Sequence, residues 1–165
     1  MAMDKKYSKK VFAEKRDVSF NYQILDTYEC GISLEGWEVK SIVQGHVSIN
    51  ESYVKIINNE VYLVGAYVSS SSQSSDISKF FNGGNDSTRS KKLLMNRREI
   101  DKLNGKIQAS GLTLVPLRVY YNSKNKIKIA IALCEGKKNF DKRQDQKNKS
   151  IDLELKRIVK SQKSF

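Results

Sequence analysis

Residues 53–68 read YVKIINNEVYLVGAYV, and this stretch decides the class of fold. Two runs rich in valine, isoleucine and tyrosine flank Asn58 and Asn59. Asparagine tolerates the positive φ angles that a two-residue type I′ turn requires. The stretch therefore predicts an antiparallel hairpin with strands at 53–57 and 60–68. The second strand is apolar on both faces, which is typical of a central strand in a sheet.

Three further segments around this hairpin also have the character of strands. Residues 22–34 mix aromatic and β-branched side chains, and residues 112–121 and 126–133 flank a four-residue turn at 122–125. From residue 126 on, lysine and alanine alternate with isoleucine and leucine, as in a half-buried antiparallel strand. These segments predict at least two more antiparallel neighbours for the hairpin.

A short helix is predicted between the first strand and the hairpin. In residues 35–43 the side chains of Trp37, Val39, Ile42 and Val43 suit one side of a short helix, which Gly45 would end.

A longer helix is predicted over residues 91–110, where leucine and isoleucine recur at spacings of three, four and seven. Its opposite side would carry Lys91 into solvent. Gly105 could divide it into two helices, and Gly111 is a plausible C-terminal cap. A further short helical pattern lies at residues 11–15.

Together these elements predict a mainly β fold with inserted helices. About five or six short antiparallel strands suit a small closed or nearly closed barrel. We expect three regions in the chain: a basic N-terminal extension at 1–13, the barrel domain at 14–135 and a basic tail at 136–165. The tail has a narrow apolar stripe on an otherwise charged helical pattern, so alone in water it should be disordered.

Composition limits the class of protein. The chain has 165 residues and 39% hydrophobic residues, enough for one modest core. It has no run of about 18 apolar residues, and its basic start lacks the apolar segment of a secretory signal. Cys30 and Cys134 lie in apolar stretches without further metal ligands nearby. They predict reduced, packed thiols and a cytoplasmic protein.

The charge points to a polyanionic partner. The net charge is +12, and the tail alone has ten Lys and Arg against four Asp and Glu. Basic clusters interleaved with aromatic residues favour RNA, because phosphates bind cations and unpaired bases stack on rings. The tail's short apolar stripe disfavours a membrane. A generic binder of single-stranded nucleic acid and a nuclease on a similar barrel remain alternatives.

Catalytic chemistry finds little support in the sequence. His46 is the only histidine, and it lies in a turn-like Gln-Gly-His-Val-Ser segment. The chain has no phosphate-binding loop, no dinucleotide fingerprint and no zinc-protease motif. We therefore expect a non-enzymatic protein without a cofactor or metal, and nothing indicates an oligomer.

Six runs of residues, in order and approximate spacing, resemble the SsrA-binding protein (SmpB) family. They are GWEVKS at 36–41, SYV at 52–54, TRSKKLL at 88–94, REIDKL at 98–103, LVPL at 114–117 and GKKNFDKR at 136–143. The resemblance covers roughly residues 14–160. It implies an oligonucleotide-binding (OB-type) barrel that binds the tRNA-like domain of transfer-messenger RNA. It further implies entry into the vacant A site of stalled bacterial ribosomes and a tail that becomes helical in the mRNA channel.

The resemblance also nominates residues for each partner. Some of the candidate RNA-binding residues match family positions associated with the RNA, and the others are lysines of the matching motifs. Together they are Lys15, Arg16, Asn21, Tyr22, Glu29, Lys40, Thr88, Arg89, Lys91 and Lys92. Candidate ribosome-binding residues of the tail are Lys137, Lys138, Phe140, Asp141, Lys142, Arg143, Ile151, Ile158 and Val159.

Overall fold

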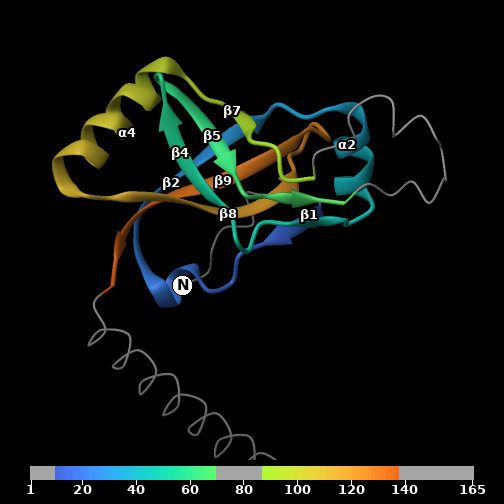
Figure 1. Cartoon of the computed structure of the whole chain (residues 1–165), viewed down its shortest axis with the longest axis horizontal. Helices are drawn as coiled ribbons and strands as arrows, with labels where there is room; N and C mark the ends of the chain where they lie inside the picture. The colour runs from blue at the N-terminus through green and yellow to red at the C-terminus, as the bar shows by residue number, and fades with distance from the viewer. Residues whose placement is uncertain (1–9, 70–86, 138–165) are drawn as a thin grey trace, which may run out of the picture.

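Strands dominate the computed structural model, which describes residues 10–69 and 87–137 (Figure 1). In chain order its elements are β1 (Lys10–Glu14), α1 (Val18–Asn21), β2 (Tyr22–Ile32), α2 (Gly36–Val43), β3 (Val47–Ser48), β4 (Tyr53–Ile57), β5 (Glu60–Val64), β6 (Tyr67–Val68), β7 (Lys91–Leu94), α4 (Arg97–Ser110), β8 (Thr113–Tyr121) and β9 (Ile127–Gly136).

Six strands pair into a closed ring. Hydrogen-bonded neighbours follow the order β8-β4-β5-β7-β2-β9, and β9 pairs back onto β8. All these pairings are antiparallel. Strand β8 pairs with β4 at Leu114 and with β1 at residues 118–121. Strand β1 therefore extends the sheet beside the ring. Within the described residues this confirms the predicted mainly β fold of about six strands with about three helices.

The predicted hairpin is confirmed, but its second strand is shorter than expected. Asn58 and Asn59 have φ angles of 50° and 59°, as a type I′ turn requires. The strand after the turn ends at Val64, because Gly65 has a φ of 74° and breaks the extended backbone. The following residues form β6, which pairs with β3 in a separate two-stranded sheet.

Replacing Gly65 with alanine should lower the free energy of unfolding by about 1–3 kcal/mol, because a side chain there is strained at positive φ. The added Cβ would also lie 3.2 Å from the carbonyl oxygen of Glu51. Gly45→Ala is the matched control: Gly45 has a φ of 88° but nothing within 4 Å of the added atom. Urea unfolding should show the larger loss for Gly65→Ala. Equal losses would mean that the contact with Glu51 costs nothing.

The short helix predicted at 11–15 was wrong, and the long helix predicted over 91–110 was wrong in its first residues; strands stand in both places. Residues 11–14 belong to β1, which pairs with β8, and residues 91–94 form β7, which lies between β5 and β2 in the ring. The long helix α4 starts only at Arg97 and runs through Gly105 without interruption. Gly111 caps it with a φ of 61°, as predicted.

The predicted short helix at 35–43 is confirmed as α2, but burial does not follow its apolar side. Glu38 and Ser41 are buried, whereas Val39 is 38% exposed. The periodicity of apolar residues cannot reveal such buried polar partners. In the fold Glu38 pairs with two cations, Arg89 just before β7 and Lys91 at the start of β7.

Two apolar clusters hold the fold together. The larger one, with residues such as Leu63, Leu93 and Leu103, is formed by the strands of the ring with α2 and α4. A smaller cluster packs α1 against strands β8 and β9 through Val18, Val115, Ala132 and Cys134. Strand β9 is therefore buried on both faces near its C-terminal end, and the half-buried pattern predicted there was wrong at Ala132.

Both cysteines are buried and free, and burial raises the pKa of the Cys30 thiol to about 12.

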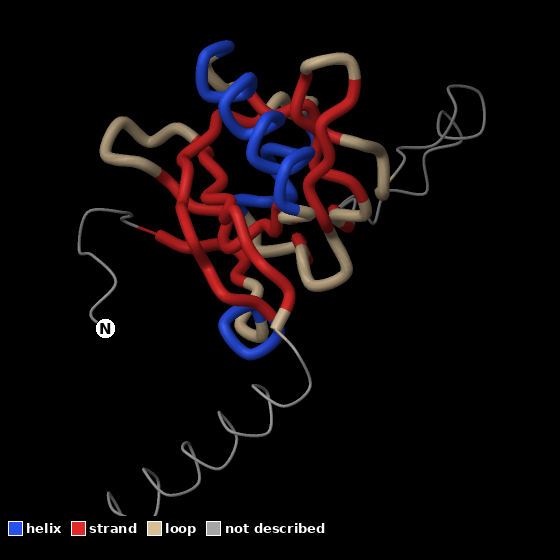
Figure 2. Tube along the Cα trace, turned by 90° about the vertical axis from the view of Figure 1, so that its left-hand side faces the viewer, coloured by secondary structure: helices blue, strands red, loops and turns tan. Residues whose placement is uncertain are grey.

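Figure 2 shows α1 at the end of the strands where the last described residues also lie. The element that covers the smaller cluster thus lies beside the last described residues.

Candidate nucleic-acid interface

The segment between β1 and α1 carries the first pair of predicted RNA-binding residues. Strand β1 pairs with β8, and the backbone N–H of Lys15 continues this pairing by donating to the carbonyl of Leu117 at 2.8 Å. The ammonium group of Lys15 donates to the carbonyl of Ser52 at 3.2 Å. Arg16 follows as an exposed residue. The pairing with β8 therefore fixes the backbone that carries both cations.

Helix α1 arranges the next two predicted residues. The side-chain amide of Asn21 donates to Asp17, 3.2 Å from its carboxylate oxygen, and so spans the single turn of the helix. Tyr22 begins β2 and packs against the smaller apolar cluster. The side chain of Asn21 therefore makes a contact within α1. The side chain of Tyr22 contributes to the packing of the domain, in addition to any contact with a partner.

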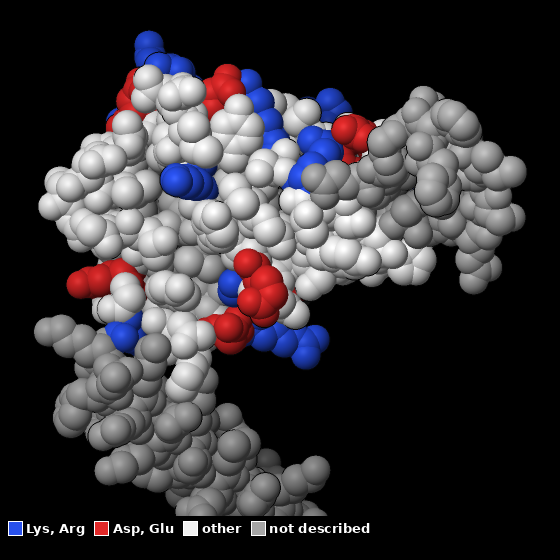
Figure 3. Space-filling view, viewed as in Figure 1, with Lys and Arg blue, Asp and Glu red and all other residues white. Residues whose placement is uncertain are grey.

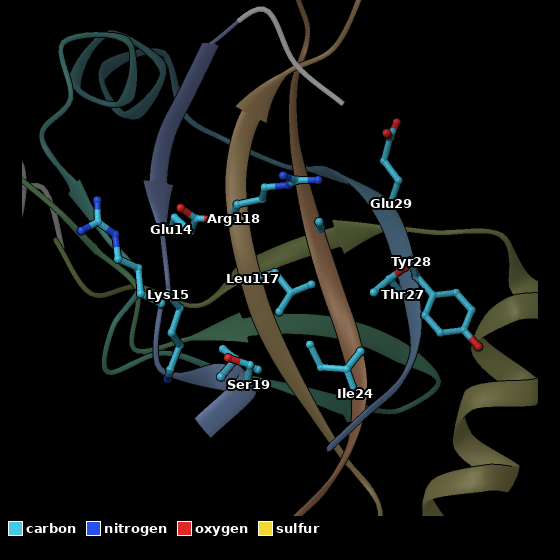
Figure 4. A pocket seen from close by; sticks show the side chains of 12 residues that line it. Glu14, Lys15, Ser19, Ile24, Thr27, Tyr28, Glu29, Leu117 and Arg118 are labelled. Atoms are coloured by element: carbon cyan, nitrogen blue, oxygen red, sulfur yellow. The ribbon is translucent and has the colours of Figure 1, made fainter. Parts of the chain in front are cut away.

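A pocket of about 320 Å³ lies between this segment and the strands β2, β8 and β9 (Figure 4). The structure brings three predicted residues together there, because Lys15, Arg16 and Glu29 all line it. The remaining lining residues are Glu14, Val18, Ser19, Ile24, Thr27, Tyr28, Leu117, Arg118 and Ala130. The pocket has apolar walls and charged side chains of both signs at its edges.

Glu29 belongs to a small polar group on the outer side of the strands. The buried Tyr120 donates its hydroxyl to the Glu29 carboxylate at 2.5 Å, and the guanidinium of Arg118 lies 5.7 Å from the centre of the Tyr120 ring. Figure 4 shows the Arg118 side chain extending across β9 in the direction of Glu29. Sequence reasoning missed Arg118. The available signal was an arginine in an otherwise apolar strand.

A second group lies at α2 and β7. The Glu38 carboxylate is fully buried and accepts from Arg89 at 2.5 Å, while the Lys91 ammonium group lies 3.4 Å from its other oxygen. Lys91 is only 1% exposed and also donates to the carbonyls of Ala66 and Arg89. Its predicted place on a solvated helix face was wrong, because its charge is compensated inside the protein.

The surface beside this group holds two more predicted residues. Lys40 is exposed on α2, and Thr88 is exposed next to Arg89. Glu35 joins the group by pairing with the Arg89 guanidinium at 3.3 Å. Arg89 is therefore held from two sides by carboxylates and stays partly exposed.

Lys92 lies apart from both groups. Its ammonium group forms an exposed pair with Glu60 of β5, and this hydrogen bond raises the pKa of Lys92 and lowers that of Glu60. A similar exposed pair joins Lys106 of α4 to Asp26, whose pKa the hydrogen bond from Lys106 lowers. In these pairs the carboxylates neutralise part of the positive charge of the domain.

The root of the tail is attached to α1. The backbone N–H of Lys137 donates to the carbonyl of Asn21 at 3.1 Å, and its ammonium group donates to the carbonyl of Ser19 at 2.9 Å. The other predicted tail residues lie outside the described residues: Lys138, Phe140, Asp141, Lys142, Arg143, Ile151, Ile158 and Val159.

Charge is unevenly divided along the chain. The described residues hold 17 Lys and Arg against 11 Asp and Glu, which is half of the total excess. On the face in Figure 3, charged side chains of both signs gather at the upper and lower margins around a mostly uncharged area. Among the described residues there is no helix long and apolar enough to cross a membrane, and no cluster of potential metal ligands.

Comparisons with known proteins agree with the resemblance of the motifs. The family model described as SmpB protein matches residues 12–161. An SsrA-binding protein of Trichodesmium erythraeum is 40% identical over 160 residues, covering 97% of this chain and 99% of the relative. That of Ruthia magnifica is 43% identical over 155 residues, covering 94% and 90% of the two chains.

A solved structure described as "tmRNA-SmpB: a journey to the center of the bacterial ribosome" contains a similar chain. The two chains are 37% identical with a TM-score of 0.59, and the match covers 76% of this chain and 84% of the other. With the family model spanning nearly the whole sequence, these matches leave one assignment: this chain belongs to the SmpB protein family.

Proposed function

We propose that this protein is an adaptor for ribosome rescue. It binds the tRNA-like domain of transfer-messenger RNA and delivers that RNA to the A site of stalled ribosomes, where the unfinished peptide is tagged. The observation that carries this proposal is the match to SsrA-binding proteins at about 40% identity over nearly the full length of both chains. The solved neighbour, whose description names tmRNA, SmpB and the ribosome, supports the same partners.

The RNA-binding role belongs to the barrel domain. Lys15 and Arg16, at the edge of the pocket, would contact phosphates, and Glu29 would accept hydrogen bonds from base edges or ribose hydroxyls. Arg89 and Lys40 form the second basic contact near α2. Lys91 would instead hold the backbone of Arg89 in place, since its ammonium group is enclosed by protein acceptors.

The ribosomal role belongs to the tail at 136–165. Its basic residues would contact ribosomal RNA through phosphates, and its apolar stripe would be buried only after binding. The adaptor would act as a monomer in the cytoplasm, where ribosomes stall. Its contribution is to position RNA, so no catalytic group is required.

Binding to transfer-messenger RNA should be preferred over an unrelated RNA of equal length and should weaken steeply with salt, because each neutralised phosphate releases counterions. Arg16→Gln should reduce the slope of log K against log salt by about one unit. Lys124→Gln, in the exposed turn before β9, is the matched control and should leave the slope nearly unchanged. Gel-shift competition at several salt concentrations measures both effects. Equal affinity for the unrelated RNA would contradict the proposed function and favour a generic nucleic-acid binder.

A further inference from the structure

Helix α1 is a single turn, and its C-terminal end has to be closed by other parts of the chain. The last carbonyl groups of a helix have no hydrogen-bond donor inside it. In α1 the carbonyl of Val18 accepts from the backbone N–H of Tyr22, the residue that follows the helix. The carbonyls of Ser19 and Asn21 therefore need donors from elsewhere.

Lys137, which lies 118 residues after Ser19 in the chain, supplies both donors. Its ammonium group donates to the carbonyl of Ser19 at 2.9 Å, and its backbone N–H donates to the carbonyl of Asn21 at 3.1 Å. Helix α1 has no basic residue in its own last turn, where a cation is favourable. Lys137 thus closes α1 as a basic residue near the end of a helix commonly does.

The backbone just before Lys137 is held as well. Strand β9 ends at Gly136, which pairs with Tyr22 at the start of β2. The bond from the Lys137 N–H to Asn21 follows directly after this pair and reaches into α1. Backbone and side chain of one residue therefore join the end of β9 to α1, and the two segments lie together in Figure 2.

Helix α1 connects this attachment to the rest of the domain. Val18 is 3% exposed and packs with β8 and β9 in the smaller apolar cluster. Ser19 lines the pocket described above, and α1 leads directly into β2. A change at Lys137 would therefore be felt in the segment that carries several of the predicted RNA-binding residues.

We propose that Lys137 is a positioning residue, which joins the root of the tail to α1 and so fixes where the tail leaves the domain. This inference rests on the proposed function and gives Lys137 a different role from a phosphate contact. It acts through the carbonyls of Ser19 and Asn21. Its loss should therefore impair the use of the tail more than the affinity for RNA.

The attachment can be tested on the full-length, isotope-labelled protein without RNA. Lys137→Met keeps an unbranched side chain and removes the ammonium donor. Amide hydrogen exchange at Tyr22 should become about two- to fivefold faster, the scale of a cation lost from a helix C-terminus. The carbonyl-carbon signal of Ser19 should shift in nuclear magnetic resonance spectra, because its hydrogen bond is lost. Lys138→Met removes the same charge one residue later and should change neither.

The rate of peptide tagging distinguishes positioning from a general effect on stability. With folded protein and transfer-messenger RNA at saturating concentrations, Lys137→Met should lower the maximal rate of tagging several-fold. Lys137→Arg keeps a charged donor of similar reach and should restore most of the rate. An unchanged maximal rate in Lys137→Met would show that the residue only supports the fold and would overturn the proposal.

The salt dependence of ribosome binding distinguishes positioning from a phosphate contact. A lost phosphate contact lowers the slope of log K against log salt by about one unit. For the complex with transfer-messenger RNA, Lys137→Met should leave this slope nearly unchanged. A decrease by a full unit, with exchange at Tyr22 as in the wild type, would overturn the proposal.

The two proposals fail in different ways. Exchange at Tyr22 and the Ser19 signal are measured without RNA, so wild-type values in Lys137→Met would overturn the attachment and leave the proposed function intact. A wild-type protein that does not prefer transfer-messenger RNA would contradict the function itself, whatever Lys137→Met does to α1.

Discussion

Ending the chain at Lys137 should leave RNA binding largely intact and abolish peptide tagging on stalled ribosomes. The shortened protein keeps the whole described fold, including the bonds from Lys137 to Ser19 and Asn21. It loses residues 138–165, which hold nine Lys and Arg against four Asp and Glu. A reconstituted translation reaction on a message without a stop codon measures tagging, and a gel shift at physiological salt measures RNA binding.

A second variant separates the charge of the tail from its apolar stripe. Full-length protein with Ile158→Ser and Val159→Ser keeps every charged residue, so its attraction to RNA should be unchanged. Tagging should still fall strongly, because burial of the apolar stripe is what would stabilise the helix, and the two serines remove part of that stripe. Normal tagging by the shortened chain would refute the proposed role of the tail.

Glu38→Ala should destabilise the protein by about 3–5 kcal/mol, the second large effect that we expect. The substitution leaves the buried ammonium group of Lys91 and part of the Arg89 guanidinium without their shared carboxylate. Breaking one member of a buried ion pair costs this much because the remaining charge stays desolvated. It also removes the capping box of α2, in which Glu38 accepts from the backbone N–H of Glu35 at 2.8 Å. Guanidinium chloride unfolding measures the loss.

Glu60→Ala is the matched control for this experiment. Its carboxylate pairs with Lys92 in the same way, but both side chains are about 40% exposed. Exposed pairs contribute little to stability, so the loss for Glu60→Ala should be far smaller than the loss for Glu38→Ala. Similar losses for the two variants would show that the buried group around Glu38 does not stabilise the fold.

Local signals predicted those parts of the fold that depend on neighbouring residues. The turn at Asn58 and Asn59 and the cap at Gly111 require positive φ, and only certain residues tolerate it. The strand at 91–94 was mistaken for a helix because its leucines also suit a helical period. Its true state is set by pairing with β2 and β5, which are distant in sequence.

The candidate site was less accessible to local reasoning. Charge and aromatic content predicted an RNA partner, whereas the individual residues came from the resemblance to a family. The placement of Lys15 and Glu29 at one pocket depends on three strand pairings: β1 with β8, β8 with β9, and β9 with β2. Arg118 was missed because the bulge at Leu117, which changes the register there, has no signature in a single sequence.

The attachment of Lys137 to α1 fixes the point from which the last 28 residues depart. Fully extended, a segment of that length spans at most roughly 90–100 Å, and as one helix it spans roughly 40 Å. Folding of the tail into one helix would therefore shorten the greatest distance between Lys137 and the C-terminal end by about half or more. Because Lys137 is bonded to Ser19, which lines the pocket, tension along the tail would act first on the edge of the domain that we propose binds RNA.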